Sequence, residues 1–157
     1  MIPYGHQYLD GADAKAVLKV LKSDWLTTGP KISEFEKALS KYCGARYAVV
    51  FSSGTAALHA AYFASGLKKG DEFITSPLTF AATANAGLYL GARPVFADIE
   101  WETGNIDPKE VEKKITRRTK AIVAVDYAGL PVKLAELKKI AKKRRLVLIE
   151  DAAHALG

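Results

Sequence analysis

The sequence predicts an α/β fold, in which a mostly parallel β-sheet is covered by helices on both faces. Short apolar or β-rich runs alternate with longer segments of helical periodicity along almost the whole chain. Five such short runs are present, and their apolar character is typical of parallel strands that are buried on both sides. The 157 residues are 49% hydrophobic and 25% charged, which predicts a single globular domain or part of one.

The chain begins with a predicted helical segment, residues 1–45, that leads into the sheet. Residues 12–22 carry apolar side chains at helical spacing: Ala14, Val17, Leu18 and Leu21. Pro30 is suited to the first turn of a second helix. An N–H in the first turn has no acceptor within the helix, so proline, which lacks this N–H, loses no hydrogen bond there. The apolar positions of that helix are Ile32, Phe35, Leu39 and Tyr42.

The remaining elements follow in alternation. Residues 47–51 are the first predicted strand, and residues 55–65 form an Ala-rich helix that Gly66 would end. Asp107 and Pro108 mark a helix start twice, as an N-cap with Glu110 three residues later and as a proline at the first helical position. The other expected strands are 72–75, 94–99, 121–125 and 146–149, and the other expected helices are about 79–90 and 133–143.

Composition limits the function. The net charge is +6, and the basic residues gather late in the chain on segments that read as amphipathic helices, where we expect them to face water. They are not interleaved with aromatic residues, so we expect no nucleic-acid partner. The lone Cys43 and the lack of a Cys/His cluster predict neither an internal disulfide nor a metal site. No apolar run is long enough to cross a membrane and the start does not resemble a signal peptide, so we expect a cytoplasmic protein.

Two segments carry candidate chemistry. Ser53-Gly54-Thr55-Ala56 lies between the first strand and a helix, where free N–H groups and the helix dipole favour a phosphate, although a plain N-cap is the alternative. The segment 146–157, LVLIEDAAHALG, is an apolar strand that ends in Asp151, with His154 shortly after it. Open α/β sheets build their sites at this end of a strand. Taken singly, Asp151 could instead cap a turn, and His154 and Phe80 could be core residues.

Several segments, in order and in register, resemble the DegT/StrS family of pyridoxal-phosphate (PLP) enzymes, the sugar-nucleotide aminotransferases with the aspartate-aminotransferase type of fold (fold type I). The matching segments are Ile2-Pro3-Tyr4-Gly5, Leu26-Thr27-Thr28-Gly29-Pro30, Ser53-Gly54-Thr55-Ala56-Ala57-Leu58-His59, Ser76-Pro77-Leu78-Thr79-Phe80-Ala81-Ala82-Thr83-Ala84-Asn85, Thr103-Gly104-Asn105 and Glu150-Asp151-Ala152-Ala153-His154-Ala155-Leu156-Gly157. With Val125-Asp126-Tyr127-Ala128-Gly129, the first segment looks closest to the branch that aminates C4 of UDP-4-keto-6-deoxy-N-acetylhexosamines.

The resemblance implies roles for individual residues. Gly54, Thr55 and Ala56 match the positions that hold the cofactor phosphate, and Phe80 matches the aromatic residue that stacks on the pyridine ring. Asp151 matches the carboxylate that pairs with the pyridinium nitrogen, which keeps that nitrogen protonated and the ring electron-withdrawing. His154 matches the position beside the phenolic oxygen. Substrate contacts fall in the segments of Tyr4, Thr28 and Asp126.

The resemblance also implies parts that the sequence does not match. The family's lysine, which forms a Schiff base with the cofactor, follows the matched aspartate by a few tens of residues in a serine-rich context, and no lysine here has that context. The family's large domain has seven strands and is followed by a small domain. We therefore expect residues 1–157 to be the N-terminal portion of such an enzyme. Alone, this portion should be inactive and should bind the cofactor weakly or not at all. Strand 47–51 should lack its neighbour in the sheet and expose an apolar edge.

Three functions remain open at this point. The first is transfer of an amino group, from glutamate as donor, to a keto-sugar nucleotide in a homodimeric enzyme. The second is the family's dehydratase branch, which uses the same cofactor and replaces the lysine with histidine. The third is a non-catalytic chain that binds phosphate ligands or a partner chain.

Overall fold

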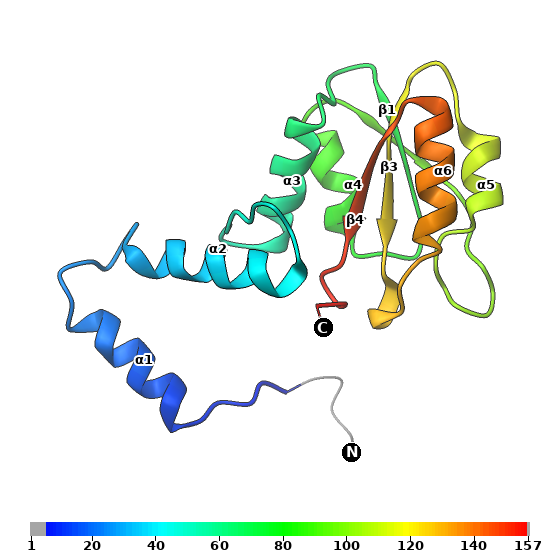
Figure 1. The fold of residues 1–157 in the computed structure, drawn as a ribbon. Coiled ribbons are helices and arrows are strands. Elements are labelled where there is room, and N and C mark those ends of the chain that lie inside the picture. The colour runs from blue at the N-terminus through cyan, green and yellow to red at the C-terminus, as the bar shows by residue number, and fades with distance from the viewer. Residues whose placement is uncertain (1–5, 157) are drawn as a thin grey trace. The chain divides into compact units, whose positions relative to one another are not determined.

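A computed structural model describes residues 6–156, which fall into two compact units that divide between Val50 and Phe51. The first unit contains two helices, and the second contains the sheet with all its covering helices. Figure 1 labels the elements.

The first unit consists of α1 (Gly11–Leu21) and α2 (Pro30–Cys43). Asp10 caps α1, because its carboxylate accepts from the N–H of Ala12 at 2.7 Å while the Asp13 carboxylate accepts from the N–H of Asp10 at 2.9 Å. Pro30 begins α2 as predicted, and Gly44 ends it with φ +63°. Neither helix buries a residue completely, so the apolar stripes of both stay largely exposed within the described part of the chain.

The second unit alternates helices and strands. Its elements in order are α3 (Gly54–Ala64), β1 (Glu72–Thr75), α4 (Ala81–Leu88), β2 (Arg93–Phe96), α5 (Pro108–Lys114), β3 (Thr119–Val125), the 3₁₀ turn η1 (Tyr127–Gly129), α6 (Leu134–Arg144) and β4 (Val147–Asp151). The predicted helix start at Asp107 is confirmed, since its carboxylate accepts from the N–H of Lys109 at 2.8 Å and Pro108 opens α5. Gly66, at φ +80°, follows the end of α3 as expected.

The four strands form one parallel sheet in the order β2-β1-β3-β4. Because all strands run the same way, their carboxyl ends lie along one edge of the sheet, and the helices α3 and α4 begin at that edge (Figure 1). The register aligns Val125 of β3 with Asp151 of β4. The predicted α/β class with a parallel sheet is confirmed.

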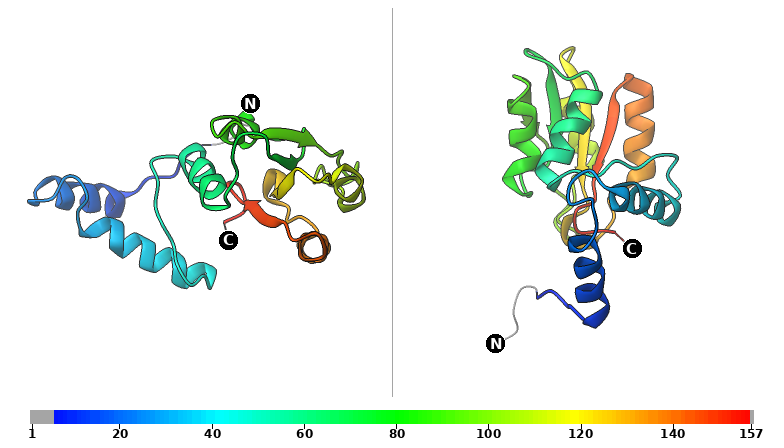
Figure 2. Two further views of the ribbon diagram at one scale, coloured as in Figure 1. Left: turned by 90° about the horizontal axis from the view of Figure 1, so that it is seen from above. Right: turned by 90° about the vertical axis from the view of Figure 1, so that its left-hand side faces the viewer.

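A separate core fills each face of the sheet. One contains Ile74, Ile122 and Leu137, beneath α5 and α6, and the other contains Tyr62, Phe73 and Val123, beneath α3 and α4. Seen from above, the two helix pairs lie on opposite sides of the strands (Figure 2). Alternate residues of a strand therefore serve different cores, as expected for a sheet that is covered on both faces.

The predicted strand 47–51 is not a strand in the described residues. Residues 47–51 pair with no strand. Their aromatic and β-branched side chains are largely exposed to solvent: Tyr47 at 75%, Val49 at 66% and Phe51 at 45%. A strand requires a neighbour for its backbone groups, and here the Val50 N–H is bonded to the Glu36 carboxylate at 3.1 Å. The apolar run is therefore largely exposed in the described residues, and the expectation that its sheet neighbour belongs to another part of the enzyme stays a prediction. The strand predicted at 94–99 ends at Phe96, since Ile99 pairs antiparallel with Ile106.

Candidate functional site

The candidate site lies at the carboxyl edge of the sheet in the second unit. Three chain segments leave the strands there: residues 76–80 after β1, residues 126–129 after β3, and residues 152–156 after β4. The amino end of α3 reaches the same edge. Five of the predicted cofactor residues are on these segments, and Asp151, the sixth, is the last residue of β4.

The amino end of α3 is open to solvent at the predicted phosphate residues. Ser53 is the N-cap, and its hydroxyl oxygen accepts from the N–H of Ala56 at 3.2 Å. Within residues 6–156 the N–H groups of Gly54 and Thr55 have no hydrogen-bond acceptor. A Cβ built on Gly54 would meet no atom within 4 Å. Two N–H groups at the positive end of the helix dipole are therefore without an acceptor in this part of the chain.

Asp151 is held from one side by helix α4. The Thr83 hydroxyl donates to Asp151 Oδ2 at 2.9 Å, and the Thr79 and Thr83 hydroxyls are 2.8 Å apart. Asp151 Oδ1 has only a long contact, 3.4 Å, with the N–H of Ala153. No cationic side chain of the described residues lies within ion-pair distance of this half-buried carboxylate.

Tyr62 connects α3 to the same cluster. Its hydroxyl donates to the carbonyl oxygen of Thr83 at 2.7 Å, and its ring is fully buried against Phe73. Burial raises the pKa of the Tyr62 phenol well above its ordinary value, and the negative charge of Asp151 adds to the increase. The phenol therefore stays protonated and acts as a fixed donor.

The two predicted ring neighbours are both exposed. The Phe80 side chain is 79% accessible, which is unusual for a phenylalanine and leaves its ring face open to a ligand. His154 lies in the turn after β4 and is also exposed. Gly129, at φ +87°, lies so near this turn that an added Cβ would be 3.0 Å from the His154 carbonyl oxygen. The turn after β3 thus packs directly on the turn that carries His154.

The turn after β3 contains Asp126, which is buried and already hydrogen-bonded. Asp126 Oδ1 accepts from the N–H of Val132 at 2.9 Å. Asn105 holds the same turn, since its Oδ1 accepts from the N–H of Tyr127 and its Nδ2 donates to the Leu130 carbonyl, both at 2.9 Å. These bonds give Asp126 a structural task, and its predicted substrate contact stays a prediction.

Glu150 has the opposite orientation to Asp151, because neighbouring residues of a strand point to opposite faces. Desolvation and the nearby Asp126 charge raise the pKa of the Glu150 carboxyl, although Lys138 opposes the effect. The two acidic residues that end β4 are therefore in different environments, and only Asp151 faces the segment that carries Thr83.

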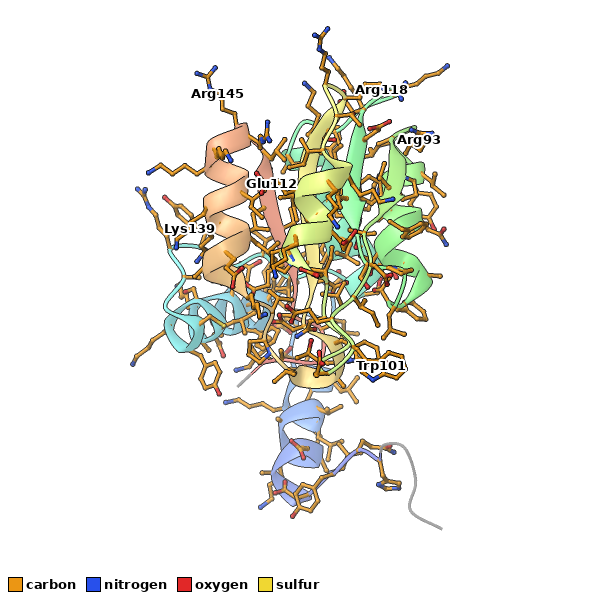
Figure 3. All side chains as sticks on the ribbon, turned by 90° about the vertical axis from the view of Figure 1, so that its right-hand side faces the viewer. Arg93, Trp101, Glu112, Arg118, Lys139 and Arg145 are labelled. Atoms are coloured by element: carbon orange, nitrogen blue, oxygen red, sulfur yellow. The ribbon has the colours of Figure 1, made fainter. Side chains whose placement is uncertain are left out.

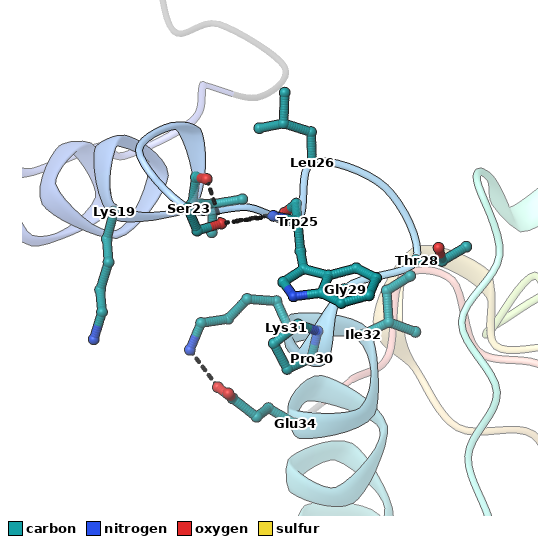
Figure 4. Close-up of a pocket in the computed structure, with 11 residues that line it drawn as sticks. Lys19, Ser23, Trp25, Leu26, Thr28, Gly29, Pro30, Lys31, Ile32 and Glu34 are labelled. Atoms are coloured by element: carbon teal, nitrogen blue, oxygen red, sulfur yellow. Dashed lines mark hydrogen bonds and ion pairs between the residues drawn. The ribbon is translucent and has the colours of Figure 1, made fainter.

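The two other predicted substrate residues are not in this unit as described. Tyr4 lies outside the described residues. Thr28 belongs to the first unit, where it lines a pocket of about 270 Å³ between the end of α1 and the start of α2 (Figure 4). The Thr28 backbone has a φ of +49°, which is strained for a threonine. Trp25 lies so close to Gly29 that a Cβ added there would be 2.9 Å from the Trp25 Cβ. Its substrate contact likewise stays a prediction.

The amino edge of the sheet has a different character. The Glu72 carboxylate is 1% exposed and pairs with Arg93 at 2.6 Å and Arg118 at 2.9 Å. Thr116 donates to its other oxygen at 2.6 Å. Figure 3 shows Arg93, Arg118 and Arg145 at this end and Trp101 at the other. Hydrogen bonds from Thr116 and Arg93, with the charges of Arg118 and Arg93, hold the pKa of Glu72 below its usual range despite its burial.

Other site types find no support in residues 6–156. They contain no group of three or more His, Cys, Asp or Glu side chains placed to hold a metal ion. In the same part of the chain, no helix has the length and apolar character that crossing a membrane requires.

Sequence reasoning assigned no role in the site to Thr83, Thr79, Tyr62 or Asn105, although all but Tyr62 lie in the segments that match the family. Thr83 and Asp151 are 68 residues apart, so no local pattern links them. One signal was available: Thr79 and Thr83 are four residues apart, and Thr83 is the only hydroxyl residue of the otherwise Ala- and Gly-rich α4. In the helix predicted at about 79–90, residues four apart share one face, although the observed α4 begins only at Ala81.

Comparison with known proteins matches the geometry to a family. The profile of the DegT/DnrJ/EryC1/StrS aminotransferase family matches residues 7–157. A UDP-4-amino-4,6-dideoxy-N-acetyl-beta-L-altrosamine transaminase of Campylobacter jejuni is 47% identical over 160 residues, which cover 100% of this chain and 42% of that protein.

Solved structures agree with this match. An aminotransferase involved in the biosynthesis of pseudoaminic acid, from Helicobacter pylori, has a TM-score of 0.95 at 46% identity, covering 99% of this chain and 42% of its own. The NtdA protein of Bacillus subtilis, with bound cofactor PMP, has a TM-score of 0.89 at 38% identity, covering 92% of this chain and 33% of its own.

The chain thus spans about two fifths of the length of the curated relative, and a third to two fifths of the solved structures. Aminotransferases of the matched family depend on PLP, and the solved neighbours include one with the bound cofactor. The family match extends over nearly the whole chain, and the solved structures share its fold at well over 30% identity. The chain belongs to the DegT/DnrJ/EryC1/StrS aminotransferase family.

Proposed function

We propose that this chain is the cofactor-binding portion of a PLP-dependent sugar aminotransferase that transfers an amino group from glutamate to a keto-sugar nucleotide. The observation that carries the proposal is the placement of Asp151. A half-buried carboxylate at the carboxyl edge of the sheet has a neutral donor on one oxygen and no cation among the described residues. A protonated ring nitrogen is a partner of suitable charge and donor type.

The residues at this edge fit the cofactor in three ways. Gly54 and Thr55 offer free N–H groups to a phosphate, with open space where a Cβ would otherwise stand. Phe80 offers an exposed aromatic face to a ring. Asp151 offers an acceptor to the ring nitrogen. When bound, the cofactor supplies an electron-withdrawing ring that stabilises negative charge on the substrate carbon.

Each residue has a separate task in this proposal. The α3 amino end binds and orients the phosphate, so that the ring takes one position. Phe80 covers one face of the ring and excludes water from it. Asp151 holds the proton on the ring nitrogen, and His154 lies near the phenolic oxygen. Asp126, Thr28 and Tyr4 contribute to the sugar-nucleotide side, the first by fixing the turn after β3.

The covalent step needs a lysine, and the 157 residues contain none in the family's lysine context. We therefore propose that the chain alone binds the cofactor weakly and does not transaminate. After incubation with PLP and reduction with borohydride, mass spectrometry should show no single lysine labelled stoichiometrically. Stoichiometric labelling of one lysine would contradict this part of the proposal.

A chimaera tests the activity directly. This chain replaces the matching segment of the Campylobacter jejuni transaminase, to which it is 47% identical. With PLP, glutamate and a UDP-4-keto-6-deoxy-N-acetylhexosamine, the chimaera should form the amino sugar, and its Asp151→Asn variant should not. A folded chimaera that binds PLP but makes no amino sugar would contradict the proposed aminotransferase activity. Loss of water from the sugar instead would favour the dehydratase branch.

A further inference from the structure

We propose that Thr83 is a positioning residue, whose hydroxyl fixes the Asp151 carboxylate so that Oδ1 is presented to the cofactor's ring nitrogen. The inference rests on the proposed function for its ligand. Its geometry rests on contacts that involve only this chain.

The two oxygens of Asp151 differ in what they contact. Oδ2 receives the Thr83 hydroxyl at 2.9 Å, a normal hydrogen-bond length, whereas Oδ1 has only the 3.4 Å contact with the Ala153 N–H. An ionised carboxylate accepts at both oxygens. The hydroxyl therefore occupies one oxygen, sets the plane of the carboxylate and leaves the other able to accept a short, charge-assisted bond.

The direction of the hydroxyl chain follows from proton counting. Thr83 has one hydroxyl proton, which it must donate to Asp151, because a carboxylate has none to give. The 2.8 Å bond between Thr79 and Thr83 is then donated by Thr79. Successive donors strengthen one another, so Thr79 supports the bond that Thr83 makes. Thr79 directly precedes Phe80, so the ring-stacking segment and the carboxylate are connected through two hydroxyls.

A purely structural role predicts a different side-chain contact. A threonine inside a helix can turn its hydroxyl back to a carbonyl three or four residues earlier or out to solvent, and threonine is a weaker helix former than alanine. Thr83 is completely buried, and its hydroxyl contacts the side chains of Thr79 and Asp151 instead. Tyr62 of α3 fixes the Thr83 backbone through its carbonyl. Thr83 thus joins the helix of the phosphate residues to the end of β4.

Two substitutions separate the hydroxyl from the methyl group. Thr83→Val keeps the shape and loses the hydroxyl, whereas Thr83→Ser keeps the hydroxyl and loses the methyl. Thr75→Val is the matched control, because Thr75 is equally buried and its Oγ1 is the one buried side-chain polar atom of the described residues without a hydrogen-bond partner. Thr79→Val provides a second test that leaves Thr83 unchanged.

The experiment measures two quantities on the 157-residue chain and these variants. The first is the affinity for pyridoxamine phosphate relative to inorganic phosphate, followed by NMR titration, which measures weak binding. Thr83→Val should lose roughly ten-fold in this ratio, about 1.4 kcal/mol. Thr79→Val should lose less, and Thr83→Ser and Thr75→Val should stay near the wild type. An unchanged ratio in Thr83→Val, or an equal loss in Thr83→Ser, would overturn the inference.

The second quantity is the ¹³Cγ chemical shift of Asp151 in the free chain. It should move in Thr83→Val and stay in Thr83→Ser and Thr75→Val, and no movement in Thr83→Val would refute the hydroxyl contact. If the wild type instead shows no preference for pyridoxamine phosphate over phosphate, the proposed function fails. The cofactor is then also not the ligand that Asp151 binds in this inference. The chemical shift then still decides whether Thr83 orients Asp151, so the two failures are distinguishable.

Discussion

Glu72 and Asp151 are carboxylates at opposite ends of the same parallel sheet, and they are satisfied in opposite ways. Glu72 is buried at the amino edge, with two arginines and a threonine hydroxyl around it. Asp151 is half-buried at the carboxyl edge, with one threonine hydroxyl and no cation among residues 6–156. The difference supports a structural role for Glu72 and the proposed ligand-binding role for Asp151. The chain itself neutralises the first, whereas the second keeps the capacity to bind a cation.

This comparison predicts two kinds of mutational effect. Removal of the Glu72 charge should change the stability of the fold, because its partners are part of the fold. Removal of the Asp151 charge should change ligand binding, because the partner that we propose for this carboxylate is a ligand.

Glu72→Gln should lower the free energy of unfolding by about 2 kcal/mol, the usual worth of hydrogen bonds to a charged group. Chemical denaturation measures it. Glu112→Gln is the matched control, because Glu112 also pairs with two cations, Lys143 at 3.0 Å and Arg144 at 3.7 Å, but its side chain is 41% exposed. The control should change little. Equal effects would show that burial does not distinguish the two networks.

The same network has a defined pH dependence. The pKa of Glu72 is lowered in the folded state, so its contribution to stability is complete above the unfolded pKa and is lost as pH falls through the folded pKa. The stability difference between the wild type and Glu72→Gln should therefore shrink on acidification. A difference that stays constant down to strongly acidic pH would contradict this assignment.

Asp151→Asn should leave the unfolding midpoint near that of the wild type, since the half-exposed carboxylate has one neutral hydrogen-bond donor at normal length. Its preference for pyridoxamine phosphate over inorganic phosphate should fall by roughly ten-fold or more, because a charge-assisted bond becomes a neutral one. NMR titration and thermal melting together measure both. A large loss of stability with unchanged binding would reverse the comparison with Glu72.

Gly54→Ala should weaken binding of inorganic phosphate and of pyridoxamine phosphate several-fold and to the same degree. The added methyl would meet no protein atom, so the fold should remain, but it would take up open space at the helix end where we propose that the phosphate binds. Gly11→Ala is a control with equally open surroundings outside the second unit. Unaltered phosphate binding in Gly54→Ala would place the phosphate elsewhere.

Glu150→Gln should give the smallest effect, a modest rise in melting temperature at neutral pH. Because the folded state raises the pKa of Glu150, its charge destabilises the fold above that pKa, and the penalty disappears as pH falls and the group is protonated. The rise should therefore vanish in acid. A fall in melting temperature at neutral pH would show that Lys138 outweighs Asp126.

Local sequence signals predicted most of the elements. The strand at 72–75 and the helix start at Pro30 agree with the structure, because proline geometry and short apolar runs act within a few residues. The segment 47–51 has strong strand character and is not a strand, since pairing depends on a distant neighbour. Residues with unmistakable local chemistry are thus predictable, and pairings across the sequence are not.

The candidate site shows the same division. Family resemblance located Gly54, Phe80, Asp151 and His154 on segments that the fold brings to one edge. It gave no indication that Thr83 holds Asp151, or that Asn105 fixes the turn of Asp126, because these contacts span 68 residues and more than 20 residues. Both contacts are hydrogen bonds that involve a side chain with no distinguishing feature in the sequence.

The protonation state of the cofactor's ring nitrogen tests most directly whether Asp151 is a ligand-binding carboxylate. Pyridoxamine phosphate labelled with ¹⁵N in the ring is titrated with the wild-type chain and with Asp151→Asn, and the ¹⁵N shift is followed across neutral to alkaline pH. With the wild type, the bound nitrogen should remain protonated at pH values where the free cofactor has lost this proton, and with Asp151→Asn it should not. A bound nitrogen that titrates as in free solution, identically in both proteins, would contradict the proposal that Asp151 binds the ring nitrogen.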